Sequence, residues 1–211
     1  MYKYVPKKEA SQYKRYCSNL LVSLRDSLKK EEKIIVTCQL IGSGAKNMVT
    51  RNGKGPFDLD YNLVLSSIPE EYANNPGKVK EIVRLRLDAL IKEDKKNISP
   101  GKNSTSSITY IFHSHGKKKV DFKLDIAIIL EDKKTAYRLI YDKPQNQYIW
   151  NELPHYAHLP EKVEWIKKSG KTNDLRDDYL RLKNMYLERQ DDNHPSFVVY
   201  AEAVEEVYQK C

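Results

Sequence analysis

The sequence predicts an α/β protein of the α+β type, in which a mixed β-sheet with flanking helices is followed by a helical C-terminal part. Three observations support this prediction. Helix-like and strand-like apolar patterns alternate along residues 1–150, two neighbouring strand-like runs form a hairpin pattern, and helical patterns fill the rest. We therefore expect two domains, a mixed-sheet core at 1–150 and a helical subdomain at 151–211.

The first part of the chain alternates helix and strand signals. Residues 6–30 carry apolar side chains at helical spacing, and residues 33–41 are almost continuously apolar and β-branched, which predicts an interior strand covered on both faces. Residues 57–65 alternate as a strand does, and residues 76–96 have a second helical pattern that begins with a proline. The polar segment 99–107 is expected to be a loop.

Two strand-like runs follow, at 108–113 and 119–130, and the short polar turn at 114–116 predicts that they form an antiparallel hairpin. A further short strand is expected at 137–141. Beyond it, three segments have the apolar periodicity of helices, at 160–169, 173–190 and 195–210.

The composition excludes a membrane-spanning protein. The chain has 211 residues, of which 40% are hydrophobic and 31% charged. It has no apolar run near the ~20 residues that a membrane helix needs. The basic start has no apolar segment behind it, so we expect a cytoplasmic protein without a secretory signal and without a membrane partner. Its three cysteines, an odd number without metal-type spacing, are expected to be free thiols.

The charge is unevenly distributed along the chain. The formal net charge is +8, and residues 1–120 hold 23 Lys and Arg against 12 Asp and Glu, whereas residues 121–211 hold 14 against 17. A basic first part fits binding of phosphate or nucleic acid. It fits a lysine-rich solvated surface equally well, so charge alone does not decide between these possibilities.

A pair of acids lies on one predicted strand. Asp58 and Asp60 are two residues apart in FDLDYNL, so both project from the same face. Two like charges on one face repel each other, and a divalent cation such as Mg²⁺ between them would make the arrangement favourable. The alternative is an edge strand that presents its polar face to water.

The second hairpin strand adds further acids. In KVDFKLDIAII, Asp121, Lys123 and Asp125 project from one face and apolar side chains from the other. Three carboxylates that converge across neighbouring strands are what two-metal phosphoryl transfer requires. Lys123 could instead neutralise an acid in a cross-strand ion pair, most readily Asp121. Asp125 lies deeper in the apolar run and is the better candidate for the third acid.

A glycine-rich turn precedes these acids. Gly42, Ser43 and Gly44 directly follow the first predicted strand, and glycines allow backbone N–H groups to approach an anion closely while a serine hydroxyl adds another donor. A lone Gly-Ser-Gly is more often an ordinary turn. Its place between one strand and an Asp-x-Asp strand favours a phosphate site.

These motifs in this order resemble the DNA polymerase β-like nucleotidyltransferase superfamily. The resemblance implies that Gly42 and Ser43 bind the nucleotide triphosphate and that Asp58, Asp60 and Asp125 hold two Mg²⁺ ions, with Mn²⁺ as a possible substitute. The implied fold is a nucleotidyltransferase core. The implied reaction moves an NMP from an NTP to an acceptor hydroxyl and releases pyrophosphate.

The C-terminal part is similar to the branch of oligoadenylate synthase-like enzymes and bacterial cyclic-oligonucleotide synthases. The resemblance rests on four short segments, YIWNELP, VEWIK, LRLKNMYL and HPSFVVY. It implies that Lys183 and Ser196 bind the triphosphate, in a helical subdomain at 151–211 that completes the nucleotide cleft. An exposed helix lysine in an i, i+4 charge pattern is the alternative for Lys183. The acceptor stays open: a small molecule, an RNA, a protein or a second nucleotide.

The segment between the glycine turn and the acids is longer than is usual for the superfamily and contains Lys46, Arg51 and Lys54. We expect this basic loop to be mobile and to bind the nucleotide or a polyanionic acceptor. A silent nucleotide- or RNA-binding module on the same fold is the alternative to an enzyme. Such a module would not need three acids, so their presence favours the enzyme.

Overall fold

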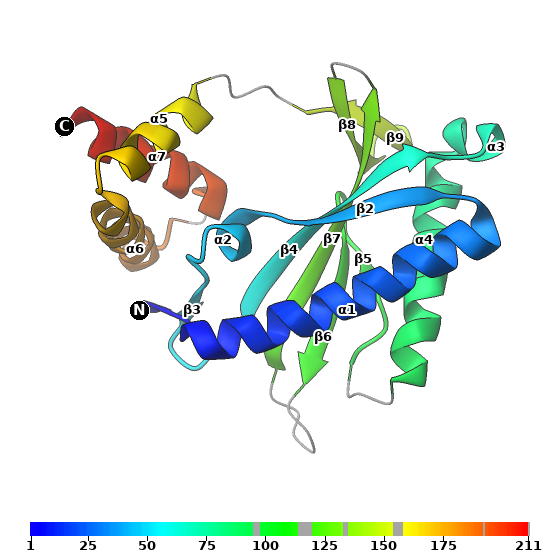
Figure 1. Cartoon of the computed structure of the whole chain (residues 1–211), viewed down its shortest axis with the longest axis horizontal. Coiled ribbons are helices and arrows are strands. Elements are labelled where there is room, and N and C mark those ends of the chain that lie inside the picture. Colours follow the sequence, from blue (N-terminus) through cyan, green and yellow to red (C-terminus); the bar gives the residue numbers. More distant parts are fainter. Residues whose placement is uncertain (95–97, 114–119, 133–134, 154–157, 192, 211) are drawn as a thin grey trace. The chain divides into compact units, whose positions relative to one another are not determined.

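The computed structural model of the protein describes residues 1–94, 98–113, 120–132, 135–153, 158–191 and 193–210 (Figure 1). The chain forms two compact units. The sheet unit comprises Pro6–Val49 and Gly55–Leu153, and the helical unit comprises Met1–Val5, Thr50–Lys54 and the described residues from 158 onward. Residues 1–5 and 50–54 belong to the predicted domain 1–150, but in the structure they group with the C-terminal helices.

A mixed β-sheet forms the centre of the sheet unit, as the sequence predicts. Its strands follow the order β2-β4-β7-β6-β5, while β8 pairs with β7 and β9 with β8. β4 and β7 run parallel, and the other neighbouring strands run antiparallel. The strands are β2 (Ile35–Leu40), β4 (Phe57–Ser67), β5 (Lys102–Asn103), β6 (Ile108–His113), β7 (Val120–Asp132), β8 (Thr135–Asp142) and β9 (Gln147–Glu152).

One face of this sheet packs against two long helices, α1 (Lys7–Glu32) and α4 (Pro76–Glu93). The apolar positions of β4 and β7 point to this face, where Phe57 and Phe122 stack with their ring centroids 5.8 Å apart. Tyr13 of α1 lies edge-on to Phe57 at 5.4 Å. Because strand residues alternate between faces, the polar positions of the same strands are left on the opposite face.

The two long helices of the sheet unit form where the sequence predicts them, although α4 ends at Glu93, three residues before its predicted end. The segment 6–30, with apolar side chains at helical spacing, forms α1. The residue that follows this helix, Lys33, has the left-handed conformation with a φ of 56°. The proline at 76 opens α4, and the Asn75 side chain accepts a hydrogen bond from the Lys78 amide there. The predicted hairpin turn at 114–116 lies outside the described residues, but the hairpin pairing of β6 with β7 is confirmed.

The prediction for residues 33–41 is wrong in one respect. β2 stands at the end of the strand order, next to β4, and is not an interior strand covered on both faces. Its burial alternates, and Ile35 is 46% exposed. The continuous apolar run predicted burial of both faces, whereas the alternating burial shows that one face of this strand is largely exposed, and the sheet order makes β2 an edge strand.

The helical unit contains α5 (Leu159–Lys168), α6 (Thr172–Glu188) and α7 (Ser196–Gln209), and these match the three predicted helical segments. It also holds a two-stranded sheet that the sequence did not predict, in which β1 (Tyr2–Tyr4) pairs with β3 (Thr50–Asn52). Part of the expected basic loop is therefore a strand. Two short helices, α2 (Gly42–Ala45) and α3 (Glu70–Ala73), belong to the sheet unit.

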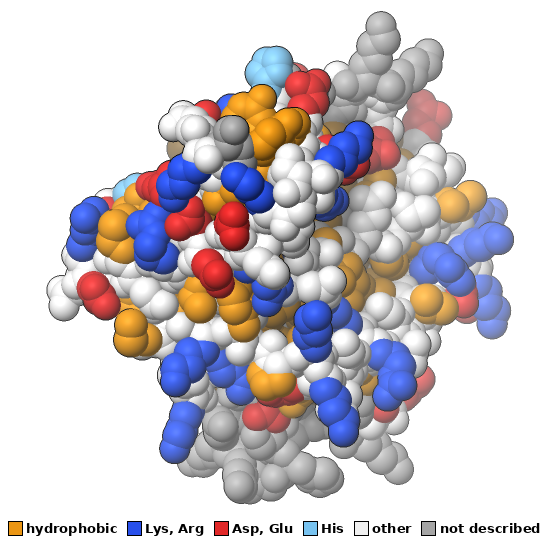
Figure 2. Space-filling view, turned by 60° about the vertical axis from the view of Figure 1, so that its left-hand side comes forward, with side chains coloured by type: hydrophobic (Ala, Val, Ile, Leu, Met, Phe, Trp, Pro, Cys, Tyr) orange, Lys and Arg blue, Asp and Glu red, His pale blue; other side chains and the backbone are white. Residues whose placement is uncertain are grey.

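None of the helices described here is long and apolar enough to span a membrane. Cys17 and Cys38 are free thiols, as expected. Burial raises the pKa of the half-buried Cys38 thiol to about 11. On the face drawn in Figure 2, Lys and Arg side chains are interspersed with Asp and Glu side chains.

Candidate active site

The strand register brings two of the predicted acids together. In the parallel pairing of β4 with β7, Asp60 stands opposite Asp125, and Asp58 stands opposite Lys123. All four positions alternate with buried apolar residues, so their side chains lie on the face away from α1 and α4. The parallel pairing thus places three acids on one face of two adjacent strands.

Asp58 is the most exposed of the three acids. Its Oδ1 lies 3.9 Å from Lys123 Nζ, and the two side chains are 55% and 41% exposed. Lys123 therefore forms a cross-strand ion pair with Asp58, whereas the sequence favoured Asp121 as its partner. An ion pair this exposed adds little to stability, because water screens it.

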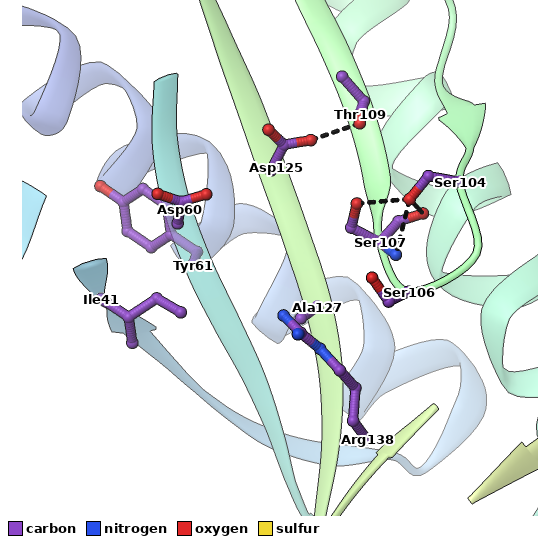
Figure 3. A pocket seen from close by; sticks show the side chains of 10 residues that line it. All are labelled: Ile41, Asp60, Tyr61, Ser104, Ser106, Ser107, Thr109, Asp125, Ala127 and Arg138. Carbon is purple, nitrogen blue, oxygen red and sulfur yellow. Dashed lines mark hydrogen bonds between the residues drawn. The ribbon is translucent and has the colours of Figure 1, made fainter. Parts of the chain in front are cut away.

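Asp125 is half-buried. It accepts a hydrogen bond from the Thr109 hydroxyl on the neighbouring strand β6 (Figure 3). Burial raises the pKa of the Asp125 carboxyl, and the nearby charge of Asp58 raises it further, whereas the Thr109 hydrogen bond and Lys123 act in the opposite direction. A cation at this carboxylate would oppose the effect of burial.

The glycine turn lies directly against Asp60. Gly42 has a φ of +59°, in the region that favours glycine, and a Cβ built on it would lie 3.0 Å from Asp60 Oδ2. The Ile41 amide also donates to the Asp60 carbonyl at 2.9 Å. The turn forms α2, and the Lys14 ammonium donates to the Gly44 carbonyl at 2.5 Å. Ser43 is half-buried in the same turn.

Two cations act on Asp60. Burial lowers the pKa of Lys46, which follows α2, and the charge of Asp60 partly restores it. The same two influences act on Arg138 of β8. The Asp60 carboxylate therefore lies within electrostatic reach of both side chains.

Asp60, Asp125 and Arg138 line a pocket of about 350 Å³ in the sheet unit, whereas Asp58, Gly42, Ser43 and Lys46 are not among its lining residues. Figure 3 shows Asp60 and Asp125 on neighbouring strands, with the serine-rich segment before β6 on one side and Arg138 reaching in from β8. The Nε atom of Arg138 is buried and has no hydrogen-bond partner among the described residues. The pocket is lined by Ile41, Asp60, Tyr61, Ser104, Ser106, Ser107, Thr109, Asp125, Ala127 and Arg138.

Sequence reasoning missed Arg138 and the serines of this pocket. The segment 99–107 was expected to be a plain polar loop, and the strand at 137–141 carried no motif. The available signal was the cluster of serines just before the predicted hairpin that carries the third acid. Whether these serines lie near the acids depends on the order of the strands, which the sequence does not show.

The donor chemistry of the acids fits magnesium, because hard carboxylate oxygens are its preferred protein ligands. Burial and, to a lesser extent, the charge of Asp58 raise the pKa of Asp125, and a cation bound to this carboxylate would oppose both effects. As the side chains lie, however, no group of three or more His, Cys, Asp and Glu residues in the described part of the chain could hold a metal ion. The acids thus fit the ion chemically without forming a complete ligand set.

The helical unit brings Lys183 and Ser196 together. Lys183 Nζ donates to Ser196 Oγ at 3.2 Å and to Thr50 Oγ1 at 3.1 Å, and it lies 4.2 Å from the centroid of the Tyr2 ring. Lys183 is half-buried, so it is not the exposed helix lysine of the alternative interpretation. The three cations of the predicted basic loop are divided, since Lys46 belongs to the sheet unit whereas residues 50–54 belong to the helical unit.

Comparison with solved structures shows that the chain has the fold of an α/β nucleotidyltransferase core, which is the fold that the resemblance in the sequence implies. The chain is similar to DncV of Escherichia coli with bound 3′-deoxy GTP, with a TM-score of 0.64 and 12% identity over 96% of this chain and 68% of that one.

It is also similar to the CD-NTase CdnG of Bradyrhizobium diazoefficiens in complex with GTP, with a TM-score of 0.59 and 14% identity over 93% of this chain and 65% of that one. For CdnC of E. coli MS115-1 with ATP, the TM-score is 0.56 and the identity 17%, over 95% of this chain and 61% of that one. This chain therefore spans less than two thirds of the length of several structures it matches. No family model and no curated protein matches the sequence.

Proposed function

We propose that the protein is a magnesium-dependent nucleotidyltransferase that moves an NMP from an NTP to an acceptor hydroxyl and releases pyrophosphate. The observation that carries the proposal is the pairing of Asp60 with Asp125 across adjacent parallel strands, at a pocket that the Gly42 turn adjoins. The fold shared with DncV, CdnG and CdnC supports it.

In this proposal Asp58, Asp60 and Asp125 hold the metal ions. When bound, these ions stabilise the charge that develops on the transferring phosphoryl group and lower the pKa of the acceptor hydroxyl. The Thr109 hydroxyl orients the Asp125 carboxylate by donating to it. In the apo protein Lys46 and Arg138 offset the charge of Asp60.

The phosphate-binding role falls to four further residues. Gly42 and Ser43 would hold phosphate oxygens with backbone and hydroxyl donors, in a turn whose conformation requires the positive φ of Gly42. Lys183 and Ser196 would bind the triphosphate, a role supported by their hydrogen bond to each other. A lysine ammonium beside two hydroxyls is a donor cluster that suits phosphate oxygens.

Within this class, we favour a nucleotide as the acceptor, so that the product would be a cyclic or linear oligonucleotide. The support comes from the neighbours: Vibrio cholerae DncV is a cyclic AMP-GMP synthase whose structure includes the linear intermediate pppA(3′,5′)pG. A catalytically silent nucleotide- or RNA-binding module remains the competing proposal.

The test is incubation with each NTP and with all four together, with Mg²⁺ or Mn²⁺, followed by mass spectrometry of the products. The double variant Asp58→Ala, Asp60→Ala is expected to lose at least about 10³-fold in turnover. Asp121→Asn, on the same face of β7, is the matched control and should stay active. Thermal stabilisation by an NTP without any product would favour the silent module, and full turnover in the double variant would refute the metal assignment.

A further inference from the structure

Lys80 of α4 is an unusual residue in this fold. Its side chain is 2% exposed, and it is the charged residue found among the buried side chains of the described chain. It shares the buried face of α4 with Val79, Ile82 and Val83. Fully buried lysines are rare unless they are paired with an acid, and the described residues give Lys80 no carboxylate partner.

The Lys80 ammonium has two contacts. Nζ donates a hydrogen bond of 2.8 Å to the carbonyl oxygen of Ser104, and it lies 5.0 Å from the centroid of the Tyr148 ring on β9. An apolar side chain at this position would avoid the cost of burying a charge. A lysine at this buried position therefore points to a role for its contact with Ser104 other than stability.

Ser104 belongs to a small, internally bonded turn. The Ser104 amide donates to the Ser107 carbonyl at 2.9 Å, the Ser107 amide donates to Ser104 Oγ at 3.0 Å, and the two hydroxyl oxygens are 2.7 Å apart. On the other side, the Tyr141 amide of β8 donates to the Thr105 carbonyl at 2.7 Å. Lys80 and Tyr141 thus fasten the turn to the helix and to the sheet.

This turn forms a wall of the pocket. Ser104, Ser106 and Ser107 all line it, together with Asp60 and Asp125 (Figure 3). The turn has few apolar side chains of its own to hold it, so its hydroxyls keep a fixed direction only if its backbone is fastened. A shift of about 1 Å in groups that bind a substrate can cost about a hundredfold in rate.

We propose that Lys80 is a positioning residue, which fastens the Ser104–Ser107 turn from behind so that its hydroxyls bind the nucleotide that enters the pocket beside Asp60 and Asp125. This role rests on the proposed nucleotidyltransferase function. Lys80 acts through the turn and does not touch the substrate.

Burial makes the contact sensitive to pH. It lowers the pKa of the Lys80 ammonium from 10.5 to about 8, and the titratable group packed against it is the Tyr148 phenol. Above this pH the lysine donates as a neutral amine, and a hydrogen bond from a neutral donor is weaker than one from an ammonium. The hydrogen bond from Lys80 to the Ser104 carbonyl therefore weakens in mildly alkaline solution.

The test compares Lys80→Met with Lys78→Met. Lys78 lies on the same helix, but its side chain is 48% exposed and pairs with Glu81 at the surface, so it controls for loss of a lysine from α4. Lys80→Gln keeps a neutral donor. We expect the KM for the NTP to rise about tenfold in Lys80→Met and less in Lys80→Gln, with kcat changed by no more than about twofold. In the wild type and in Lys78→Met, but not in Lys80→Met, KM should rise further above about pH 8.

A second measurement separates this inference from the function on which it rests. Hydrogen exchange at the Ser104 and Ser107 amides should be about tenfold faster in Lys80→Met than in Lys78→Met at the same pH, whether or not the protein turns over any NTP. If the Ser104 and Ser107 amides exchange faster in Lys80→Met but the wild type turns over no NTP, Lys80 does fasten the turn and the proposed nucleotidyltransferase function is refuted. Unchanged exchange, or equal pH profiles of KM in Lys80→Met and wild type, overturns the role of Lys80.

Discussion

The buried Lys80 ammonium makes the stability of the protein depend on pH, and the substitution Lys80→Met removes this dependence. In the folded state its pKa falls from the ordinary value of 10.5 to about 8 because the side chain is 2% exposed. Below about pH 8 the lysine is charged in both states, and the folded state bears the cost of burying the charge. Between these two pKa values the unfolded chain binds a proton that the folded chain does not, so stability rises with pH.

The magnitude follows from the shift. Each pKa unit is worth about 1.4 kcal/mol, so the difference between 10.5 and about 8 corresponds to about 3 kcal/mol of destabilisation near neutral pH. Lys80→Met removes this cost but leaves the Ser104 carbonyl without its donor, which costs about 1–3 kcal/mol. We therefore expect Lys80→Met to be as stable as the wild type, or up to about 2 kcal/mol more stable, at pH 7.

At pH 10.5 the sign should reverse. The wild type regains about 3 kcal/mol relative to the variant, so Lys80→Met should then be about 1–3 kcal/mol less stable. Urea unfolding of wild type, Lys80→Met and Lys78→Met at intervals from pH 7 to pH 10.5 measures the difference, and groups common to all three cancel. A constant difference between Lys80→Met and wild type over this range would refute the burial of a charged lysine.

Two further predictions concern the acid face. Asp125→Asn should lower NTP turnover by at least about a hundredfold, while Asp121→Asn stays within about threefold of the wild type. Four strand residues place the two acids about 13 Å apart, which is too far for both to bind one pair of metal ions. Single-turnover assays measure the two rates, and the reverse ranking would identify Asp121 as the third acid. Gly42→Ala should destabilise the protein by about 1–2 kcal/mol in urea, because a Cβ there meets Asp60 Oδ2 at 3.0 Å at a φ of +59°. An alanine variant with wild-type stability would contradict that close approach.

Periodicity alone predicts the elements that carry the acids. Alternation along β4 and β7 places Asp58, Asp60 and Asp125 on a polar face, and the structure has the same alternation. Sequence spacing cannot supply the parallel register that sets Asp60 opposite Asp125, because the two residues are separated by a helix and a hairpin strand. The three-residue strands β1 and β3 are too short to show any period.

The missed parts of the pocket share one physical reason. Arg138 and the serines of the Ser104–Ser107 turn reach the pocket because β8 and β6 both lie beside β7. The hairpin pattern predicts the pairing of β6 with β7, but it does not show that the turn before β6 lines a pocket with the acids, and no local pattern predicts the pairing of β8 with β7. Lys80 did leave a local signal, since it is a charge within the buried face of α4. A lysine within an apolar helical face can also reach water along its stem, so the sequence alone does not reveal its burial.

The acid face is balanced even without a metal, and this limits what neutralising an acid can do for stability. Each acid has its own compensation: Asp58 pairs with Lys123, Asp60 is within reach of Lys46 and Arg138, and Asp125 accepts from Thr109. Removing Asp60 would relieve repulsion among the acids and would also leave Lys46 and Arg138 without its charge. The two effects oppose each other, so the loss of Asp58 and Asp60 should change the unfolding free energy far less than it changes turnover. If the double variant loses much turnover and little stability, the arrangement of these acids serves to bind an ion and not to stabilise the fold.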